Sequence, residues 1–240
     1  MNILVTGAAS ELAHALASHL SEDHQIRLTD IVDIKTDLEF VRCDLGHDET
    51  TNELVRGMDN IIHLAELPPD YSDDSLDSDN LTIDFLTRCT YNLLWAAVEE
   101  NVKKAVYGST LELFDKYDDD LTVNENWRPL PSTDPYVLGK HLGEFTCKEF
   151  ARTSQIQITC LRYGEIVRVE DVKGQPYDPA WIEIRDLVHA FECALGEKQA
   201  GLNREWSVFH IEADAPDADY PPARRARGTI GYSPKYRFRE

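Results

Sequence analysis

Residues 2–13 read NILVTGAASELA. The apolar run 2–6 predicts a strand, and the apolar repeat over residues 10–20 predicts a helix that begins immediately after it. A strand that turns through Gly7 into a helix presents free backbone N–H groups at the carboxyl edge of a sheet, where a pyrophosphate can bind. The TGAA string is weak evidence by itself, so the rest of the chain has to agree with it.

Strand and helix patterns alternate along the remainder of the chain. The strand segments are rich in Ile, Leu and Val without clean alternation, which indicates burial on both faces and hence a parallel sheet. The predicted fold class is therefore α/β, a doubly wound parallel sheet (Rossmann fold). Strands are expected at 2–6, 25–30, 39–42, 60–64, 104–109, 157–162 and 206–211, helices at 10–20, 48–56, 81–100, 135–153 and 184–195, and a loop at 165–180.

The composition excludes several classes of function. The 240 residues include 24 basic and 44 acidic side chains, and a net charge of −20 repels nucleic-acid phosphates and anionic lipid. No apolar run is long enough to span a membrane. Single, unpaired cysteines argue against a zinc site or a disulfide framework. We therefore expect a cytoplasmic chain with no metal, no nucleic-acid partner and no membrane partner.

The second predicted strand ends in an acid, Asp30. An acidic side chain at that place accepts hydrogen bonds from the adenosine ribose and repels a 2′-phosphate, so the expected cofactor is NAD rather than NADP. The alternative reading of Asp30 is an ordinary turn residue. Asp44-Leu45 follows the third strand, where the adenine ring would lie.

The strongest chemical signal is Asp134-Pro135-Tyr136-Val137-Leu138-Gly139-Lys140. Pro135 suits the first turn of a helix, and Tyr136 and Lys140, four residues apart, then share one face. A nearby ammonium favours the phenolate and lowers the pKa of the tyrosine, which would let it exchange a proton with a substrate hydroxyl. A strand ending in Ser109-Thr110 could bring a second hydroxyl to the same oxygen.

In this order, these residues resemble the extended short-chain dehydrogenase/reductase family, also called the NAD-dependent epimerase/dehydratase family. Further stretches carry the resemblance over nearly the whole chain: His63-Leu64-Ala65, Asn92-Leu93-Leu94-Trp95-Ala96-Ala97, Leu161-Arg162-Tyr163-Gly164, Ile184-Arg185-Asp186-Leu187-Val188 and Gly231-Tyr232-Ser233-Pro234. The resemblance implies an NAD-binding domain at residues 1–162, with a small substrate-binding region at 163–240 packed on it. It also implies homodimerisation through the long helices.

The resemblance further implies roles for individual residues. Tyr136 would be the general acid/base, Lys140 would hold the nicotinamide ribose, and Thr110 would orient the substrate oxygen, with Ser109 as the less favoured candidate. Hydride would pass between a substrate carbon and the nicotinamide. The residues expected to contact NAD are Gly7, Ala9, Ser10, Glu11, Leu12, Asp30, Asp44, Leu45, Leu64, Ala65, Tyr136 and Lys140.

Two departures from the family pattern raise an alternative. Ser10 stands where the second glycine of the family's TGxxGxxG belongs, and its side chain is expected to weaken cofactor binding. Leu86 replaces the active-site asparagine of the long helix. A degenerate, NAD-binding regulatory or scaffold protein without turnover is therefore the alternative from another class.

The reaction is suggested by what surrounds the tyrosine. Leu111-Glu112 replaces the Asp-Glu pair of the family's dehydratases, which argues against dehydration. The region after residue 162 is short for gripping a nucleotide-sugar and resembles the compact uronate dehydrogenase branch. We expect an NAD-dependent oxidoreductase acting on a small sugar or sugar-acid hydroxyl, with a nucleotide-sugar epimerase as the alternative. Candidate substrate contacts are Glu66, Leu111, Arg162, Trp181 and Arg185.

Overall fold

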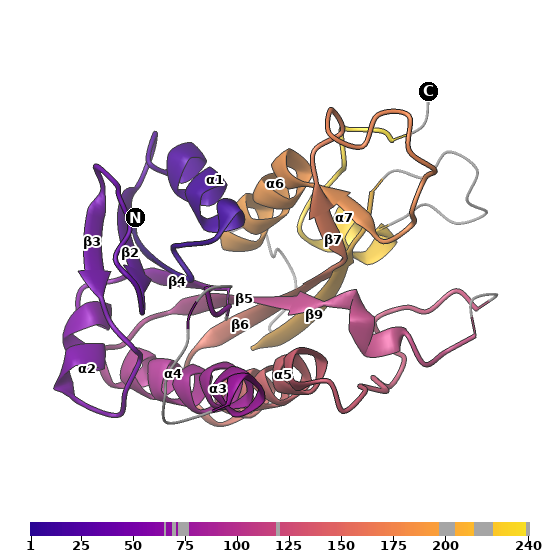
Figure 1. Ribbon diagram of the computed structural model, residues 1–240. Coiled ribbons are helices and arrows are strands. Elements are labelled where there is room, and N and C mark those ends of the chain that lie inside the picture. Colours follow the sequence, from indigo (N-terminus) through magenta and orange to yellow (C-terminus); the bar gives the residue numbers. More distant parts are fainter. Residues whose placement is uncertain are drawn as a thin grey trace.

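The computed structural model describes residues 1–64, 66–68, 71, 77–118, 121–196, 205–213 and 223–238. A seven-stranded sheet forms the centre of the molecule (Figure 1). Its strands are β1 (Asn2–Thr6), β2 (Gln25–Asp30), β3 (Glu39–Arg42), β4 (Asn60–His63), β5 (Lys104–Thr110), β6 (Gln157–Tyr163) and β9 (Trp206–Ile211). The order across the sheet is β3-β2-β1-β4-β5-β6-β9, and every pair is parallel. The predicted doubly wound parallel sheet is confirmed.

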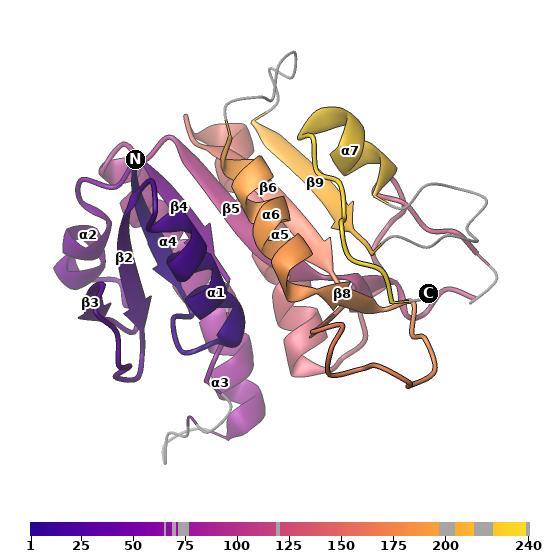
Figure 2. The same cartoon turned by 90° about the horizontal axis from the view of Figure 1, so that it is seen from above.

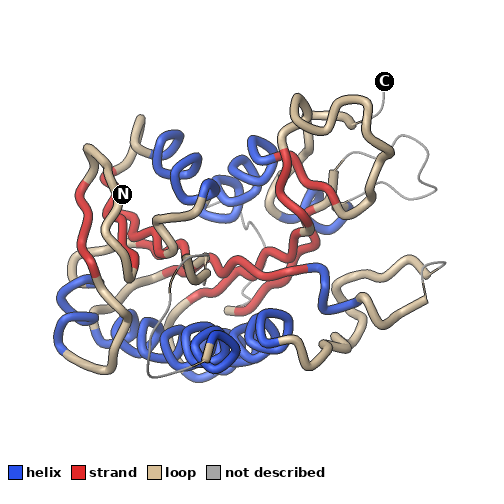
Figure 3. The backbone as a smooth tube through the Cα atoms, in the orientation of Figure 1, coloured by secondary structure: helices blue, strands red, loops and turns tan. Residues whose placement is uncertain are grey.

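Helices cover both faces of the sheet, as the blue segments on either side of the red strands in Figure 3 show. One face carries α1 (Glu11–Leu20) and α6 (Ile184–Leu195) (Figure 1). The opposite face carries α2 (Glu49–Val55), α3 (Ser78–Asp84), α4 (Thr90–Glu99) and α5 (Pro135–Thr153). Strand residues divide between the two layers with the two-residue period of a strand, since Ile3 and Val5 pack with α1 and α6 while Leu4 packs with α4.

The predicted helix at 81–100 begins earlier than expected and is not uniform. It starts at Ser78, because the Asp77 side chain caps it by accepting a hydrogen bond from the Asn80 amide at 2.9 Å. A π-helical turn at Phe85–Cys89 then separates α3 from α4. Such single turns occur often at functional sites, and this one holds Leu86 against α5.

The region after Tyr163 contains more structure than predicted. Residues 165–180, expected to be a loop, begin with a three-residue strand β7 (Glu165–Val167) that pairs with β8 (Trp181–Glu183). Strands this short leave no detectable period in a sequence. A short helix, α7 (Arg224–Thr229), was also not predicted.

This region does not stand apart from the sheet. β9 pairs with β6 and extends the sheet by one strand, while α6 packs beside α1 on its upper face (Figure 2). The segment after α7 packs on its own domain, because the amides of Lys235 and Tyr236 donate to Asp186 at 2.8 and 3.0 Å. Within the described ranges, no helix is both long and apolar enough to cross a membrane.

Candidate active site

The sheet reverses its winding between β1 and β4, and the carboxyl ends of these strands define the site. In an open α/β sheet, ligands bind in the crevice at this switch point. Gly7 ends β1 with φ +71°, a left-handed conformation that favours glycine. A Cβ at Gly7 would stand 3.4 Å from the Cβ of Leu64, so the chain leaves the ends of β1 and β4 with little space between the two segments.

The turn after Gly7 feeds the N-terminus of α1 into the crevice. The Ser10 hydroxyl donates to the Gly7 carbonyl at 2.8 Å and accepts from the Ala13 amide at 3.2 Å, so it serves as the N-cap of α1. The side chain predicted to obstruct the cofactor is thus tied back into the cap. The amides of Glu11 and Leu12 lie in the first turn, where no intrahelical acceptor exists, and can donate to a phosphate.

Glu11 would place a negative charge beside such a phosphate. Its carboxylate is paired with Arg168, whose Nη2 and Nε lie 2.6 and 2.9 Å from Oε1. Arg168 follows β7, so this ion pair joins the first helix to the region after Tyr163. The pair neutralises the charge that would otherwise repel a pyrophosphate at this helix end.

Asp30 lies at the end of β2, 5% exposed. One oxygen accepts from the Ala9 amide at 2.9 Å and the other from the amides of Ile31 and Val32 at 2.7 and 3.3 Å. These bonds fix the carboxylate in the crevice, and a carboxylate keeps further lone pairs for ribose hydroxyls. The placement fits the ribose role predicted for Asp30.

The predicted adenine site is a strained loop after β3. Leu45 is 2% exposed and has φ +54°, which is uncommon for a residue with a Cβ. Its carbonyl accepts from Nδ2 of buried Asn92 on α4 at 2.9 Å, while Asp44 accepts from the Gly46 amide at 3.0 Å. Together with Gly7, Asp30 and the start of α1, these residues fit a dinucleotide. Ala65, also predicted to contact the cofactor, lies outside the described residues.

The tyrosine and the threonine face one cavity of about 590 Å³. Asp134 caps α5 by accepting from the amides of Tyr136 and Val137 at 2.9 and 3.2 Å, which places Tyr136 in the first turn. The cavity is lined by Glu66, Thr110, Leu111, Glu112, Asp115, Tyr136, Tyr163, Gly164, Glu165, Ile166 and Ala180. Thr110 therefore joins Tyr136, together with the predicted substrate contacts Glu66 and Leu111.

Ser109 points to the other side of β5. Its hydroxyl donates to Glu144 on α5 at 2.6 Å and is 0% exposed. Neighbouring strand residues face opposite sides of a sheet, so Ser109 and Thr110 cannot both reach the cavity. The preference for Thr110 agrees with this placement, and the second candidate, Ser109, is not brought to the cavity.

Lys140 is fully buried beneath the tyrosine. Its Nζ donates to the carbonyls of Leu64 and Gly108 at 2.6 and 2.9 Å and lies 5.4 Å from the centre of the Tyr136 ring. An ammonium has three N–H groups, so one remains for another acceptor. Lys140 thus ties α5 to the ends of β4 and β5.

The prediction that the pKa of Tyr136 is lowered is wrong. Burial, Glu66 and Glu112 together raise the pKa of Tyr136 above its usual value. The spacing of Tyr136 and Lys140 within α5 revealed only the ammonium. The carboxylates of Glu66 and Glu112 follow β4 and β5, so the sequence of the helix could not reveal them. Burial also lowers the pKa of Lys140.

Three predicted substrate contacts do not line this cavity. Arg162 is enclosed with Glu144, its Nη2 2.6 Å from Oε2 and its Nε 2.7 Å from Oε1. Arg185 pairs with Glu183 and Glu170 and lies over the Tyr236 ring. Trp181 is 8% exposed and packs on Phe238. Each of them already has partners within the protein, which the sequence motif did not reveal.

Seven lining residues were not among the predicted contacts: Glu112, Asp115, Tyr163, Gly164, Glu165, Ile166 and Ala180. Glu112 accepts from the Thr110 hydroxyl at 3.2 Å, and its amide donates back to that oxygen at 3.1 Å. Tyr163 and Glu165 flank Gly164, where a Cβ would collide with the Ala180 carbonyl. The sequence signal that could have identified Tyr163 and Glu165 is their place at the end of β6.

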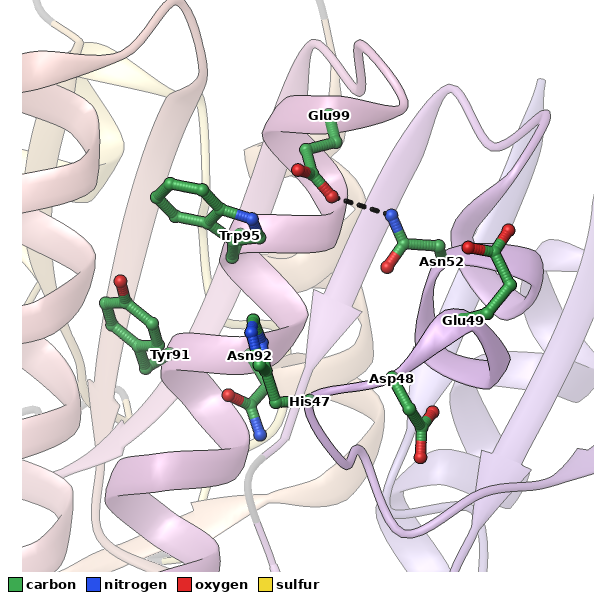
Figure 4. Close-up of a pocket in the computed structure, with 8 residues that line it drawn as sticks. All are labelled: His47, Asp48, Glu49, Asn52, Tyr91, Asn92, Trp95 and Glu99. Atoms are coloured by element: carbon green, nitrogen blue, oxygen red, sulfur yellow. Dashed lines mark hydrogen bonds between the residues drawn. The ribbon is translucent and has the colours of Figure 1, made fainter.

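A second, more open cavity of about 660 Å³ lies between α2 and α4 (Figure 4). It is lined by His47, Asp48, Glu49, Asn52, Tyr91, Asn92, Trp95 and Glu99, and Asn52 donates to Glu99 across it at 2.8 Å. None of the predicted catalytic residues lines it. Among the described residues, no group of three or more His, Cys, Asp or Glu side chains is arranged to hold a metal ion.

The crevice at the switch point of the parallel sheet, with Tyr136 facing a cavity and the Lys140 ammonium buried beneath it, fits the class of nucleotide-dependent oxidoreductases. The chain belongs to the NAD dependent epimerase/dehydratase family, whose profile matches residues 3–175. Its cofactor is NAD, and it is an enzyme of the sugar dehydrogenase and epimerase kind.

The relatives are similar over nearly the whole chain. An NAD-dependent glucose-6-phosphate dehydrogenase from Haloferax volcanii is 25% identical over 254 residues, covering 97% of this chain and 92% of that protein. A uronate dehydrogenase from Pseudomonas syringae pv. tomato is 24% identical over 232 residues, covering 92% and 81%. The crystal structure of uronate dehydrogenase from Agrobacterium tumefaciens has a TM-score of 0.80 at 22% identity, covering 99% and 85%.

Proposed function

We propose that this protein oxidises one hydroxyl of a small sugar or sugar acid and passes the hydride to NAD. The observation that carries the proposal is that Tyr136 and Thr110 line one cavity with the Lys140 ammonium directly beneath it. NAD supplies the hydride acceptor when bound. The protein's own part is to hold the substrate and to move one proton.

The three side chains divide that part between them. The Tyr136 oxygen takes the proton of the substrate hydroxyl, because Tyr136 is the one ionisable side chain among Tyr136, Thr110 and Lys140 that lines the cavity. The Thr110 hydroxyl orients the substrate oxygen. Lys140 uses its remaining N–H on the nicotinamide ribose and so fixes the distance between cofactor and tyrosine. Asp30 and the amides of Glu11 and Leu12 hold the adenosine ribose and the pyrophosphate.

The region after residue 162 supplies the substrate side of the cavity. Five residues of this region line it, from the end of β6 through β7 and from the segment before β8: Tyr163, Gly164, Glu165, Ile166 and Ala180. We propose that residues 163–240 act as the substrate-binding region, because five of the eleven lining residues come from it.

The test is a panel of small sugars and sugar acids, followed by NADH absorbance at 340 nm. Tyr136→Phe should reduce turnover by about 10²-fold or more while leaving the unfolding midpoint unchanged. Tyr117→Phe is the matched control, because Tyr117 lies in the loop after β5 and its hydroxyl donates to the Arg128 carbonyl outside the cavity. Unchanged activity in Tyr136→Phe would refute the proposed role.

Two other results would decide for the alternatives. NAD(H) that stays bound through purification, with no net NADH release, would indicate an epimerase that returns the hydride to the sugar. Failure of NAD to bind in calorimetry would remove both enzymatic readings and leave the regulatory or scaffold role.

We propose that two copies pair through α4 and α5. Four large apolar side chains on these helices are exposed: Tyr91 at 45%, Trp95 at 43%, Leu142 at 39% and Phe145 at 59%. Tyr91 stacks on Trp95 and meets Phe150 edge-on, which joins the two helices into one apolar surface. Figure 4 shows Tyr91 and Trp95 projecting from the side of α4 away from Asn52 and Glu49.

Light scattering tests this pairing. Phe145→Asp should halve the measured mass. Leu121→Asp is the control and should leave the mass unchanged, because Leu121 is 44% exposed but lies in the segment between β5 and α5, outside both helices. A monomer before mutation would contradict the proposal.

We also propose a cytoplasmic location, since all five cysteines are free thiols. Titration of the freshly purified, unfolded chain should find five thiols.

A further inference from the structure

We propose that Arg168 is a cofactor-binding residue, whose guanidinium donates to the pyrophosphate of bound NAD while it remains paired with Glu11. The contact holds the segment after β7 against the cofactor, so that NAD binding orders the substrate side of the cavity. The contact itself depends on NAD alone, whereas its consequence for the substrate rests on the function proposed above.

Arg168 connects two regions that are far apart in the sequence. It follows β7 directly, and β7 lies on the same side of the sheet as α1 and α6 (Figure 1). Its Nη2 and Nε lie 2.6 and 2.9 Å from Oε1 of Glu11, 157 positions earlier in the chain. Glu11 is the first residue of α1, so the guanidinium lies at the helix end where the amides of Glu11 and Leu12 can donate to a phosphate.

The guanidinium keeps donors for a ligand. An arginine side chain has five N–H groups, and both contacts with Glu11 end on one carboxylate oxygen. Among the residues that the structure describes, this guanidinium has no other hydrogen-bond partner, so three of its N–H groups can donate to a phosphate. The side chain of Arg168 is 42% exposed and that of Glu11 is 65% exposed, so a ligand in the crevice can reach both.

The charges at this end of the crevice favour such a contact. The pyrophosphate of NAD is an anion, and Glu11 places a carboxylate at the same helix end. The predicted ribose and adenine contacts Asp30 and Asp44 are acids as well. Lys140 is enclosed beneath Tyr136, where it donates to two carbonyls. A guanidinium supplies the missing full charge, and its planar fork matches the oxygens of a phosphate.

The turn that carries Arg168 is anchored independently of Glu11. The Asp171 amide donates to the Arg168 carbonyl at 3.0 Å. Glu170 accepts two hydrogen bonds of 2.9 Å from Arg185 in the first turn of α6. The guanidinium is therefore presented to α1 from a bonded turn, which reduces the entropy that a contact with the cofactor would cost.

The same short segment forms part of the cavity wall. Glu165 and Ile166 line the cavity, and both precede Arg168 by no more than one strand of three residues. A contact between Arg168 and the pyrophosphate therefore restrains β7 as well. We expect the substrate side of the cavity to be better ordered when NAD is bound than when it is not.

Calorimetry with NADH and its fragments tests the contact. NADH and ADP-ribose contain the pyrophosphate, and adenosine does not. Arg168→Gln should weaken the binding of NADH and ADP-ribose about 10-fold, because it removes charged hydrogen bonds. The dissociation constant of adenosine, measured by displacement of NADH, should not change, and neither should the unfolding midpoint, because an exposed ion pair contributes little to stability. Arg152→Gln, which breaks an exposed ion pair with Glu149, is the matched control and should change none of these values.

A second variant separates a direct contact from simple neutralisation of Glu11. In a Glu11→Gln background there is no charge to neutralise, but a glutamine there still accepts from the guanidinium. Arg168→Gln in this background should again weaken NADH binding several-fold. No effect in this background, an equal loss of adenosine affinity, or a wild-type protein that does not bind NADH would each overturn the proposal.

Hydrogen exchange tests the consequence for the cavity wall. Saturating ADP-ribose should slow exchange of the amides of residues 165–168 in the wild-type protein and not in Arg168→Gln. Equal protection in the two proteins would overturn the proposed ordering of β7. None of these measurements needs turnover, so a protein that meets them but forms NADH from no sugar would keep Arg168 as a cofactor contact and refute the proposed oxidation.

Discussion

Acidic side chains are paired with a basic residue on one face of strand β5 and are not on the other. Behind Ser109, the Glu144 carboxylate is enclosed by Arg162, by the serine hydroxyl and by the Cys160 thiol at 3.4 Å. In front of Thr110, four carboxylates line an open cavity without a basic partner. On the closed face the charges of Glu144 and Arg162 satisfy each other, which holds α5 against β6. The open face leaves charge unsatisfied, which is what a binding site does.

The largest expected effect breaks the closed face. Glu144→Ala should lower the free energy of unfolding by about 3–5 kcal/mol, because it leaves the Arg162 guanidinium buried without a counter-charge. Urea unfolding measures this. Glu149→Ala, which removes an exposed ion pair from the same helix, should cost less than about 1 kcal/mol. Equal losses in the two variants would contradict the distinction between the faces.

The next prediction separates the adjacent hydroxyls. Thr110→Val should reduce kcat by about 10²-fold, because its hydroxyl faces the cavity, and should also cost about 1 kcal/mol of stability, because that hydroxyl caps the turn at Leu111–Phe114. Ser109→Ala should instead cost about 1–2 kcal/mol of stability and keep most of the activity, because its partner is Glu144. Steady-state kinetics and urea unfolding on both variants decide, and the reverse pattern would exchange their roles.

A smaller effect concerns His210, which lies against Arg162 on the closed face. Burial, Arg162 and Arg225 lower its pKa to about 3, so the folded protein holds it neutral. Below the unfolded value of about 6.5 the unfolded chain binds a proton that the folded chain refuses. Stability is therefore full above pH 6.5 and falls toward pH 3 by about 1.4 kcal/mol per unit for this residue. His210→Gln should remove that share of the acid sensitivity in urea titrations at pH 7 and pH 5.

The smallest effect sharpens the open face. Glu112→Gln removes one of the charges that raise the pKa of Tyr136. The phenolate then forms at lower pH, so the rising limb of kcat/KM for oxidation should move toward acid by less than about one unit. Glu112 is partly exposed, which keeps the shift small. A profile that does not move, or moves toward alkali, would show that Glu112 does not act on Tyr136.

Much of the fold could be predicted because it depends on local pattern. The seven strands of the sheet leave buried apolar runs, and caps such as Asp134 mark helix starts, so most ends fall within a residue or two of prediction. The strands β7 and β8 are too short for any period. The π-helical turn at Phe85–Cys89 has no sequence signal of its own.

The site was predictable where it depends on spacing within one element. Tyr136 and Lys140 share a helix, and strand alternation separates Thr110 from Ser109. It was not predictable where partners come from elsewhere. No sequence pattern near Arg162 predicts that it pairs with Glu144, and none near Tyr136 predicts that Glu66 raises the pKa of the tyrosine.

The position of β9 has a consequence for how the chain is made. β6 is an inner strand only because residues 206–211 pair along it. A nascent chain interrupted before them would display the whole length of β6 as an unpaired edge, from Gln157 to Tyr163. Such an edge is a template for pairing with another chain. β9, the last strand among the described residues, therefore protects β6 from pairing with another chain. Removal of residues 206–211 should make the protein insoluble before any loss of catalysis could be measured.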